Sequence, residues 1–141
     1  MKISSAVAVI ALSAGLVGVA APAASAATCS VPTFCLYFNS NQQGAFREFD
    51  ASVASFADGS TFNKIGTTNN GYGQGVWNNA ASAKFASSTS GSVFGLFHAR
   101  VYYNSNFMGA YDSFNYPGEG AYLSVGPLTN TYNNNASLKM W

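Results

Sequence analysis

The sequence has little charge. Asp, Glu, Lys and Arg make up only 8% of its 141 residues, and the formal net charge is +1. Nucleic acids and anionic membrane surfaces are bound through clusters of Lys and Arg, and this chain has only six such residues in total. The composition therefore predicts neither a nucleic-acid partner nor a membrane partner.

Histidine and cysteine are also scarce. The single histidine, His98, has no second histidine or cysteine near it, so the sequence offers no zinc spacing and no nucleophile–base pair. The five carboxylates show no spacing that singles out an acid–base pair, and no GxSxG or phosphate-binding motif is present. We expect a structural role for His98, no catalytic residues, no cofactor, and a protein that is not an enzyme.

The first 26 residues have the pattern of a signal peptide. Lys2 precedes an apolar run at 7–19, and Ala24-Ser25-Ala26 forms an A-x-A cleavage site. An uncleaved anchor is the alternative, but the apolar run is short for a bilayer span. We therefore expect a secreted, extracellular protein. Cleavage after Ala26 would leave 115 residues (141 minus 26), which suit a single domain over 27–141. We expect this domain to be a monomer.

Both cysteines, Cys29 and Cys35, lie near the start of this domain. Export to an oxidising space makes a mutual disulfide the expected state, with two free thiols as the alternative. The closed loop is short, so the bond would pin the N-terminal segment rather than stabilise the whole domain.

The domain lacks a helix-period segment of convincing length, and its apolar residues fall in short runs between Gly and Asn. These runs predict strands at 35–39, 45–49, 81–86, 93–103, 110–114, 121–125 and 136–141, with connectors at 87–92 and 117–118. Between 50 and 76 we expect one short strand and a long loop, with Phe56, Phe62, Ile65 and Tyr72 as core anchors.

Two pairs of segments repeat along the chain. The segment 36–49 matches 101–114 at seven of 14 positions with an offset of 65 (102 minus 37), and both contain Asn-Ser-Asn and Gly-Ala. The segment 76–85 matches 131–140 at two Asn, one Ala, one Ser and one Lys, with an offset of 55. With four short strands per repeat, the duplication predicts two packed sheets with Greek-key connections around one core. The repeats run from about 29 to 88 and from about 90 to 141.

These motifs resemble a known family. Tyr102, Phe107 and Gly109 form a Tyr-x4-Phe-x-Gly hairpin that is followed by the Asn-Asn-x-x-Ser block at 133–137, as in a βγ-crystallin Greek-key motif. The resemblance implies an all-β fold, a βγ-crystallin-like sandwich of two Greek-key motifs. The N-terminal Cys-x5-Cys-Leu-Tyr resembles the secreted actinobacterial branch that includes metalloproteinase inhibitors and killer-toxin-like proteins.

This resemblance implies a peptidase inhibitor whose partner is a secreted peptidase. A metallopeptidase is the first candidate for that partner. A weak calcium-binding structural or stress module and a killer-toxin-like antimicrobial protein are the alternatives. Long loops on rigid sheets commonly carry binding, so we expect the inhibitory contacts in the loop 63–76, although a tolerated insertion would look the same. The candidate binding residues are Asn69, Asn70, Tyr72, Gln74 and Trp77.

The family's calcium signature is Asx-Asx-x-x-Ser/Thr-Ser, and here its last position holds Ala83 and Leu138. The candidate ligands are Asn78, Asn79, Ser82, Asn133, Asn134 and Ser137, none of which is charged. Calcium affinity rises with ligand charge, so we expect calcium binding to be absent or weak, on the order of 0.1 to 1 mM. The alternative is that these side chains only shape the turns before each last strand.

Overall fold

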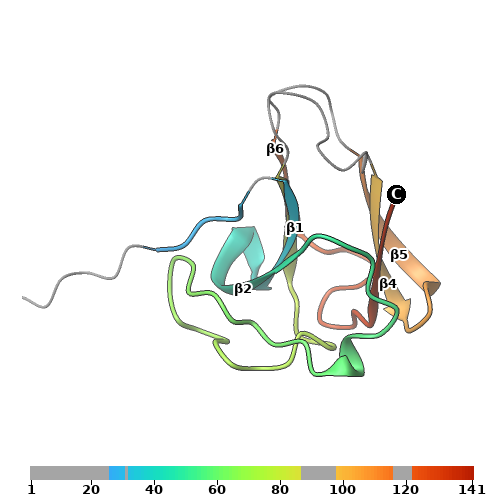
Figure 1. Cartoon of the computed structure of the whole chain (residues 1–141), viewed down its shortest axis with the longest axis horizontal. Coiled ribbons are helices and arrows are strands. Elements are labelled where there is room, and N and C mark those ends of the chain that lie inside the picture. The colour runs from blue at the N-terminus through green and yellow to red at the C-terminus, as the bar shows by residue number, and fades with distance from the viewer. Residues whose placement is uncertain (1–25, 31, 87–97, 116–121) are drawn as a thin grey trace, which may run out of the picture.

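The chain is described by a computed structural model over residues 26–30, 32–86, 98–115 and 122–141 (Figure 1). The signal peptide up to residue 25, the connector 87–92, the first part of the strand expected at 93–103, and the turn at 117–118 lie outside these residues. No helix in the described part is long and apolar enough to cross a membrane. The elements are β1 (Thr33–Asn39), η1 (Ser40–Gln42), β2 (Gln43–Phe49), η2 (Phe56–Asp58), β3 (Ser82–Ala86), β4 (His98–Asn104), β5 (Met108–Asn115), β6 (Tyr122–Pro127) and β7 (Ser137–Met140).

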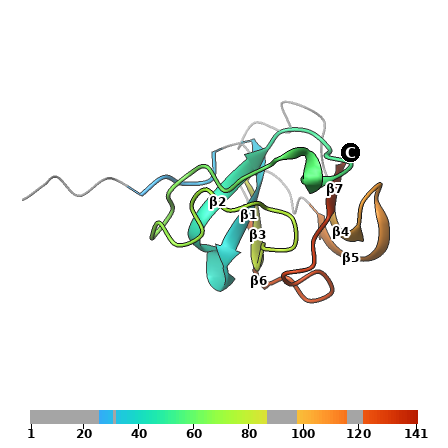
Figure 2. The same cartoon turned by 90° about the horizontal axis from the view of Figure 1, so that it is seen from below.

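The strands form two antiparallel sheets. One has the order β2-β1-β3-β6 and the other the order β5-β4-β7. Figure 2 shows β2, β1 and β3 on one side of the molecule and β7, β4 and β5 on the other. The predicted all-β sandwich is confirmed.

In each repeat, the segment that follows the hairpin pairs with a strand of the other repeat's sheet. In the second repeat, β6 leaves the β4–β5 hairpin and pairs with β3, with Lys84 opposite Ser124. In the first repeat, Val53 crosses in the other direction and forms a bridge with Leu138 of β7. The last strand of each repeat then returns beside its own first strand, β3 beside β1 and β7 beside β4. These are two Greek keys, and neither is complete without the other.

The segment 50–76 differs from the expectation. No strand forms between β2 and β3; the crossing is a single bridge at Val53, followed by the short helix η2. Phe56 and Phe62 are buried as core anchors, but Ile65 and Tyr72 are 42% and 54% exposed, so that part of the prediction is wrong. Gly and Asn give this segment turns in place of an alternating pattern, and turns point their side chains outward.

The two hairpins repeat each other in three dimensions. The register shifts between Tyr37 and Asn39 in the first and between Tyr102 and Asn104 in the second. Residues with positive φ fall at matched positions: Asn41, Gln42 and Gly44 match Asn106, Phe107 and Gly109, and Asn78 matches Asn133. The local sequence therefore sets the same unusual backbone twice.

The core lies between the sheets and draws on both repeats. Phe34 of β1 has no exposed surface and meets Phe85 and Phe114 edge to face, with ring centroids 5.9 and 5.1 Å apart. Leu36, Val101 and Leu138 are also fully buried in the same cluster. One shared core therefore fixes the relative placement of the loops that carry the candidate sites.

Candidate functional site

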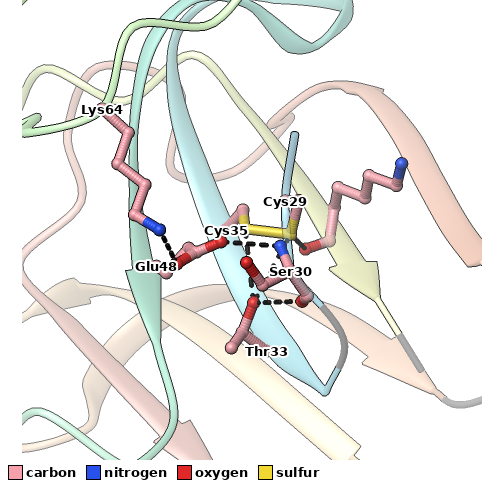
Figure 3. The surroundings of a disulfide bond; sticks show 7 residues. Cys29, Ser30, Thr33, Cys35, Glu48 and Lys64 are labelled. Atoms are coloured by element: carbon pink, nitrogen blue, oxygen red, sulfur yellow. Dashed lines mark hydrogen bonds and ion pairs between the residues drawn. A yellow bond between two sulfur atoms is a disulfide. The ribbon is translucent and has the colours of Figure 1, made fainter. Parts of the chain in front are cut away.

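The N-terminal segment is fastened to the first sheet. Cys29 and Cys35 form the expected disulfide, which belongs to a second buried cluster with Tyr37 and Phe46 (Figure 3). Burial, with a smaller effect of Glu48, raises the pKa of Tyr37 to about 12, so its phenol stays neutral. The disulfide therefore ties the N-terminal segment to the inner strand β1 within an uncharged cluster.

A polar network extends this attachment to the long loop. Ser30 N–H donates to Glu48 Oε1 at 2.6 Å, and the other oxygen of Glu48 pairs with Lys64 Nζ (Figure 3). Burial by itself raises the pKa of Glu48, but the bonds from Lys64 and Ser30 together outweigh it and hold that pKa below its usual value. Ala27 N–H also donates to Ile65 O at 2.9 Å. The start of the loop 63–76 is thus held by the N-terminal segment and by β2.

The expected binding residues of this loop are on the surface. Asn69, Asn70, Tyr72, Gln74 and Trp77 are all exposed. The turn that carries Tyr72 is closed by Tyr72 N–H to Asn69 O at 2.9 Å and by Gln74 N–H to Gly71 O at 3.0 Å. Phe62, in the core, exchanges backbone bonds with Gly73 and Gln74 at 2.8 and 2.9 Å. The turn is therefore both exposed and fixed to the core.

The loop also covers the first hairpin. Gly71 lies on the ring of Phe38 so closely that a Cβ at this position would overlap the ring. Asn70 accepts from Ala45 N–H at 2.8 Å through its carbonyl and donates from Nδ2 to Asn39 Oδ1 at 3.2 Å. Under this cover, Ala45 has no exposed surface.

Trp77 belongs to a different place from Tyr72. With Tyr103, Trp77 lines a cavity of about 220 Å³ between the two repeats. The cavity is completed by Asn78, Asn104, Ser105, Asn134 and Ala136. Its lining therefore has two exposed aromatic rings and several neutral polar side chains.

The two Asn-rich blocks, 78–82 and 133–137, form reciprocal backbone hydrogen bonds. Asn78 N–H donates to Asn135 O, and Asn133 N–H donates to Ala80 O, both at 2.9 Å. The side chain of Asn135 is fully buried, donates to the carbonyls of Ala80 and Thr131, and accepts from Ala80 N–H. Asn135 was not among the predicted site residues. The signal for it in the sequence is that it breaks the repeat, since its counterpart is Ala80.

The two serines of the candidate calcium set are used inside the fold. Ser82 Oγ donates to Asn39 O at 2.6 Å and accepts from Gln42 N–H at 3.0 Å. Ser137 Oγ does the same for the second hairpin, with Asn104 O at 2.7 Å and Phe107 N–H at 3.1 Å. Both serines have no exposed surface, and each hydroxyl holds its own hairpin closed.

The asparagines supply only neutral oxygens. Asn78 and Asn134 lie beside the cavity, while the Nδ2 of Asn79 is bonded to the carbonyls of Gly75 and Trp77. Among the described residues no three His, Cys, Asp or Glu side chains gather in one place. A donor set without a carboxylate does not fit a high-affinity calcium site, and the weak site stays a prediction.

The described carboxylates mostly serve local structure. Asp112 accepts from the backbone of Thr129, Asn130 and Thr131 and from Thr131 Oγ1, at 2.7 to 3.2 Å. Asp58 accepts from Ser60, whose side chain and backbone bonds hold the pKa of Asp58 below its usual value. The Nδ1 of His98 lies 2.9 Å from Asn115 Oδ1, and its ring stacks on Trp141. No acid–base pair is assembled from these residues.

The structure is similar to solved βγ-crystallin domains. A βγ-crystallin domain solved in connection with the evolution of the eye-lens fold matches with a TM-score of 0.53 and 16% identity, over 84% of this chain and 93% of that chain. The N-terminal domain of protein S matches with a TM-score of 0.49 and 15% identity, over 77% of this chain and 94% of that chain. A βγ-crystallin from Ciona intestinalis matches with a TM-score of 0.44 and 13% identity, over 77% and 99%.

No protein-family model and no curated protein sequence matches the chain. The fold is therefore assigned on structure alone, from the matched hairpins, the exchanged segments of the two repeats and the first of these similarities. Together they show that this chain has the βγ-crystallin domain fold.

Proposed function

We propose that this protein is a secreted inhibitor of a peptidase, with a metallopeptidase as the first candidate target. The turn at Asn69–Gln74 would fill the substrate cleft, with Tyr72 as its anchor. The observation that carries the proposal is that this turn is exposed while its backbone is bonded to buried Phe62. The crystallin-like scaffold is the general conclusion, and inhibition is the specific function proposed for it.

The physical support is preorganisation. Ordering a flexible loop on binding costs about 0.5 to 1.5 kcal/mol for each immobilised side chain, and a loop already fixed by the fold avoids much of that cost. The segment 65–75 contains no charged residue, so it can enter a cleft without desolvating an ion. Tyrosine offers a large contact area with few rotatable bonds.

The choice of a peptidase, rather than another protein partner, rests on the sequence resemblance described above. No residue in the described structure gives a specific argument for a toxin-like activity. The weak calcium module has only the neutral cavity between the Asn blocks.

The test is a stoichiometric titration of the secreted protein against thermolysin-like, subtilisin-like and trypsin-like enzymes. We expect inhibition of the thermolysin-like enzyme that Tyr72→Ala weakens by at least tenfold. Tyr132→Ala is the matched control because Tyr132 is also an exposed tyrosine, 43% against 54%, on a different loop. Absence of inhibition in all three classes would remove the function. Equal inhibition by both variants would show that the inhibitory site lies outside this turn.

A further inference from the structure

The two hairpins have the same backbone but not the same surroundings. On the first hairpin, Gly44 and Ala45 are buried beneath the long loop. Their counterparts in the second hairpin, Gly109 and Ala110, are exposed. In Figure 1 the β4–β5 hairpin lies at one edge of the molecule.

The loop shows what this kind of hairpin surface can bind. On the first hairpin an Asn-Gly dipeptide, Asn70-Gly71, occupies the surface with three contacts. The Asn70 carbonyl accepts from Ala45 N–H, its side-chain amide donates to Asn39 Oδ1, and Gly71 packs so closely against the Phe38 side chain that a Cβ has no room there. The contact requires a residue without a Cβ at the ring, because a larger one would overlap it.

The second hairpin offers the same groups, and no described residue covers them in this way. The Asn104 side chain lies over Gly109 as Asn39 lies over Gly44, because a Cβ built on either glycine would be 2.8 or 2.9 Å from the Asn Nδ2. Tyr103 stands where Phe38 does and is 46% exposed. In the described part of the chain, the Asn104 side chain has no hydrogen-bond partner, and no loop pairs with Ala110 as Asn70 pairs with Ala45.

We propose that Tyr103, Asn104, Gly109 and Ala110, the open hairpin surface, bind an exposed Asn-Gly turn of a partner protein. The Asn of that turn bonds to Ala110 N–H and Asn104 Oδ1, and the Gly lies on Tyr103. The cavity lined by Trp77 and Tyr103 borders this surface and gives room for a neighbouring side chain of the partner.

Three features fit a short turn of another protein better than other ligands. Further along β5, Asn130 Nδ2 donates to Tyr111 O at 2.8 Å, so a full added strand is blocked and only a short segment fits. A second copy of this chain presents its Asn70-Gly71 already bonded to its own first hairpin. The open hairpin surface offers one backbone N–H, one side-chain amide and one aromatic ring, as the first hairpin offers to Asn70-Gly71. Such groups recognise a peptide rather than an ion.

The test uses a cyclic peptide with the sequence of residues 66–74, GTTNNGYGQ, titrated into the isotope-labelled secreted protein. We expect saturable amide shifts at Tyr103, Asn104, Gly109 and Ala110, with a dissociation constant on the order of 1 mM, because the contact is small. Replacing the Gly of the Asn-Gly pair by Val in the peptide should abolish the shifts.

On the protein, Asn104→Leu should weaken binding by about tenfold, equivalent to about 1.4 kcal/mol, whereas Tyr132→Ala should leave it unchanged. A melting curve for each variant confirms that it is folded. No saturable shift up to about 10 mM peptide would overturn the proposal. So would equal binding by the Gly→Val peptide, binding unaffected by Asn104→Leu, or shifts at this surface caused only by a neutral oligosaccharide.

Discussion

The first and second repeats have the same framework and different surfaces. Their hairpins and their buried serines match, and residues with positive φ fall at matched positions of both repeats. Between the hairpin and the Asn block, however, the first repeat has 28 residues (50–77) and the second has 18 (115–132). The additional residues of the first repeat lie in the segment whose Asn70 and Gly71 cover its hairpin. Duplication therefore fixes the scaffold, and one insertion decides which hairpin is covered.

The difference extends to the edges of the sheets. The free edge of the first hairpin, at β2, is covered by Lys64 and Asn70. The second hairpin has Asp112 and Asn130 near its β5 edge and nothing over Gly109 in the described part of the chain. We expect the first repeat to be the more stable half and the second to be the more available for binding.

The largest expected effect tests how unequally the repeats fill the core. Phe34 of the first repeat corresponds to Ala99 of the second, so one repeat supplies the large ring at this position. Phe34→Ala should lower the free energy of unfolding by about 4 kcal/mol, because the ring is fully buried between Phe85 and Phe114. Ala99→Gly should lower it by about 1 kcal/mol. Urea denaturation measures both, and a loss below about 1.5 kcal/mol for Phe34→Ala would show that the second repeat collapses into the space.

The next effect concerns the residue at which the Asn blocks depart from symmetry. Asn135→Ala leaves the backbone N–H of Ala80 without its partner and removes one of the two hydrogen bonds accepted by the carbonyls of Ala80 and Thr131. We expect a loss of about 3 kcal/mol, because the unbonded N–H carries its full desolvation cost and two further buried hydrogen bonds are lost. Its neighbour Asn134 is exposed, and Asn134→Ala should change stability by less than about 0.5 kcal/mol. Similar losses for the two variants would mean that water replaces the buried amide.

Much of this framework could be predicted from the sequence because it is local. Asn-Ser-Asn and Gly-Ala set the hairpin turns within a few residues, and their recurrence revealed the duplication. Asn135 bonds to Ala80, 55 residues away, and Ser82 to Asn39, 43 residues away, so a local pattern does not reveal these structural contacts. The exposure of Ile65 was missed for a related reason. An isolated aliphatic residue among Gly and Asn has no periodicity that would tell which way it faces.

The loop that distinguishes the repeats can be tested with two neighbouring glycines. Gly71 and Gly73 both have positive φ, 84° and 80°, but a Cβ at Gly73 meets nothing within 4 Å whereas one at Gly71 overlaps Phe38. Gly73→Ala should cost about 1 kcal/mol for the backbone alone. Gly71→Ala should cost about 2 kcal/mol more, because the loop must move off the ring. Amide exchange at Ala45 should then speed up in Gly71→Ala only. Unchanged exchange would show that the ring, rather than the loop, moves aside.

The smallest expected effect is the pH dependence that the first repeat alone acquires from Glu48, since the matching position in the second repeat is Ser113. The folded pKa of Glu48 is held below its usual value, so the folded state binds its proton less readily than the unfolded state. Its contribution is therefore complete above the unfolded pKa of about 4.3 and is lost as the pH falls through the lower folded value. Because Lys64 is partly exposed, we expect only about 0.5 kcal/mol. Melting curves of Glu48→Gln and wild type should differ at pH 6 and converge near pH 2, with Asp50→Asn as the control from the same sheet edge. A difference that persists at pH 2 would show that Glu48 acts through packing rather than through its charge.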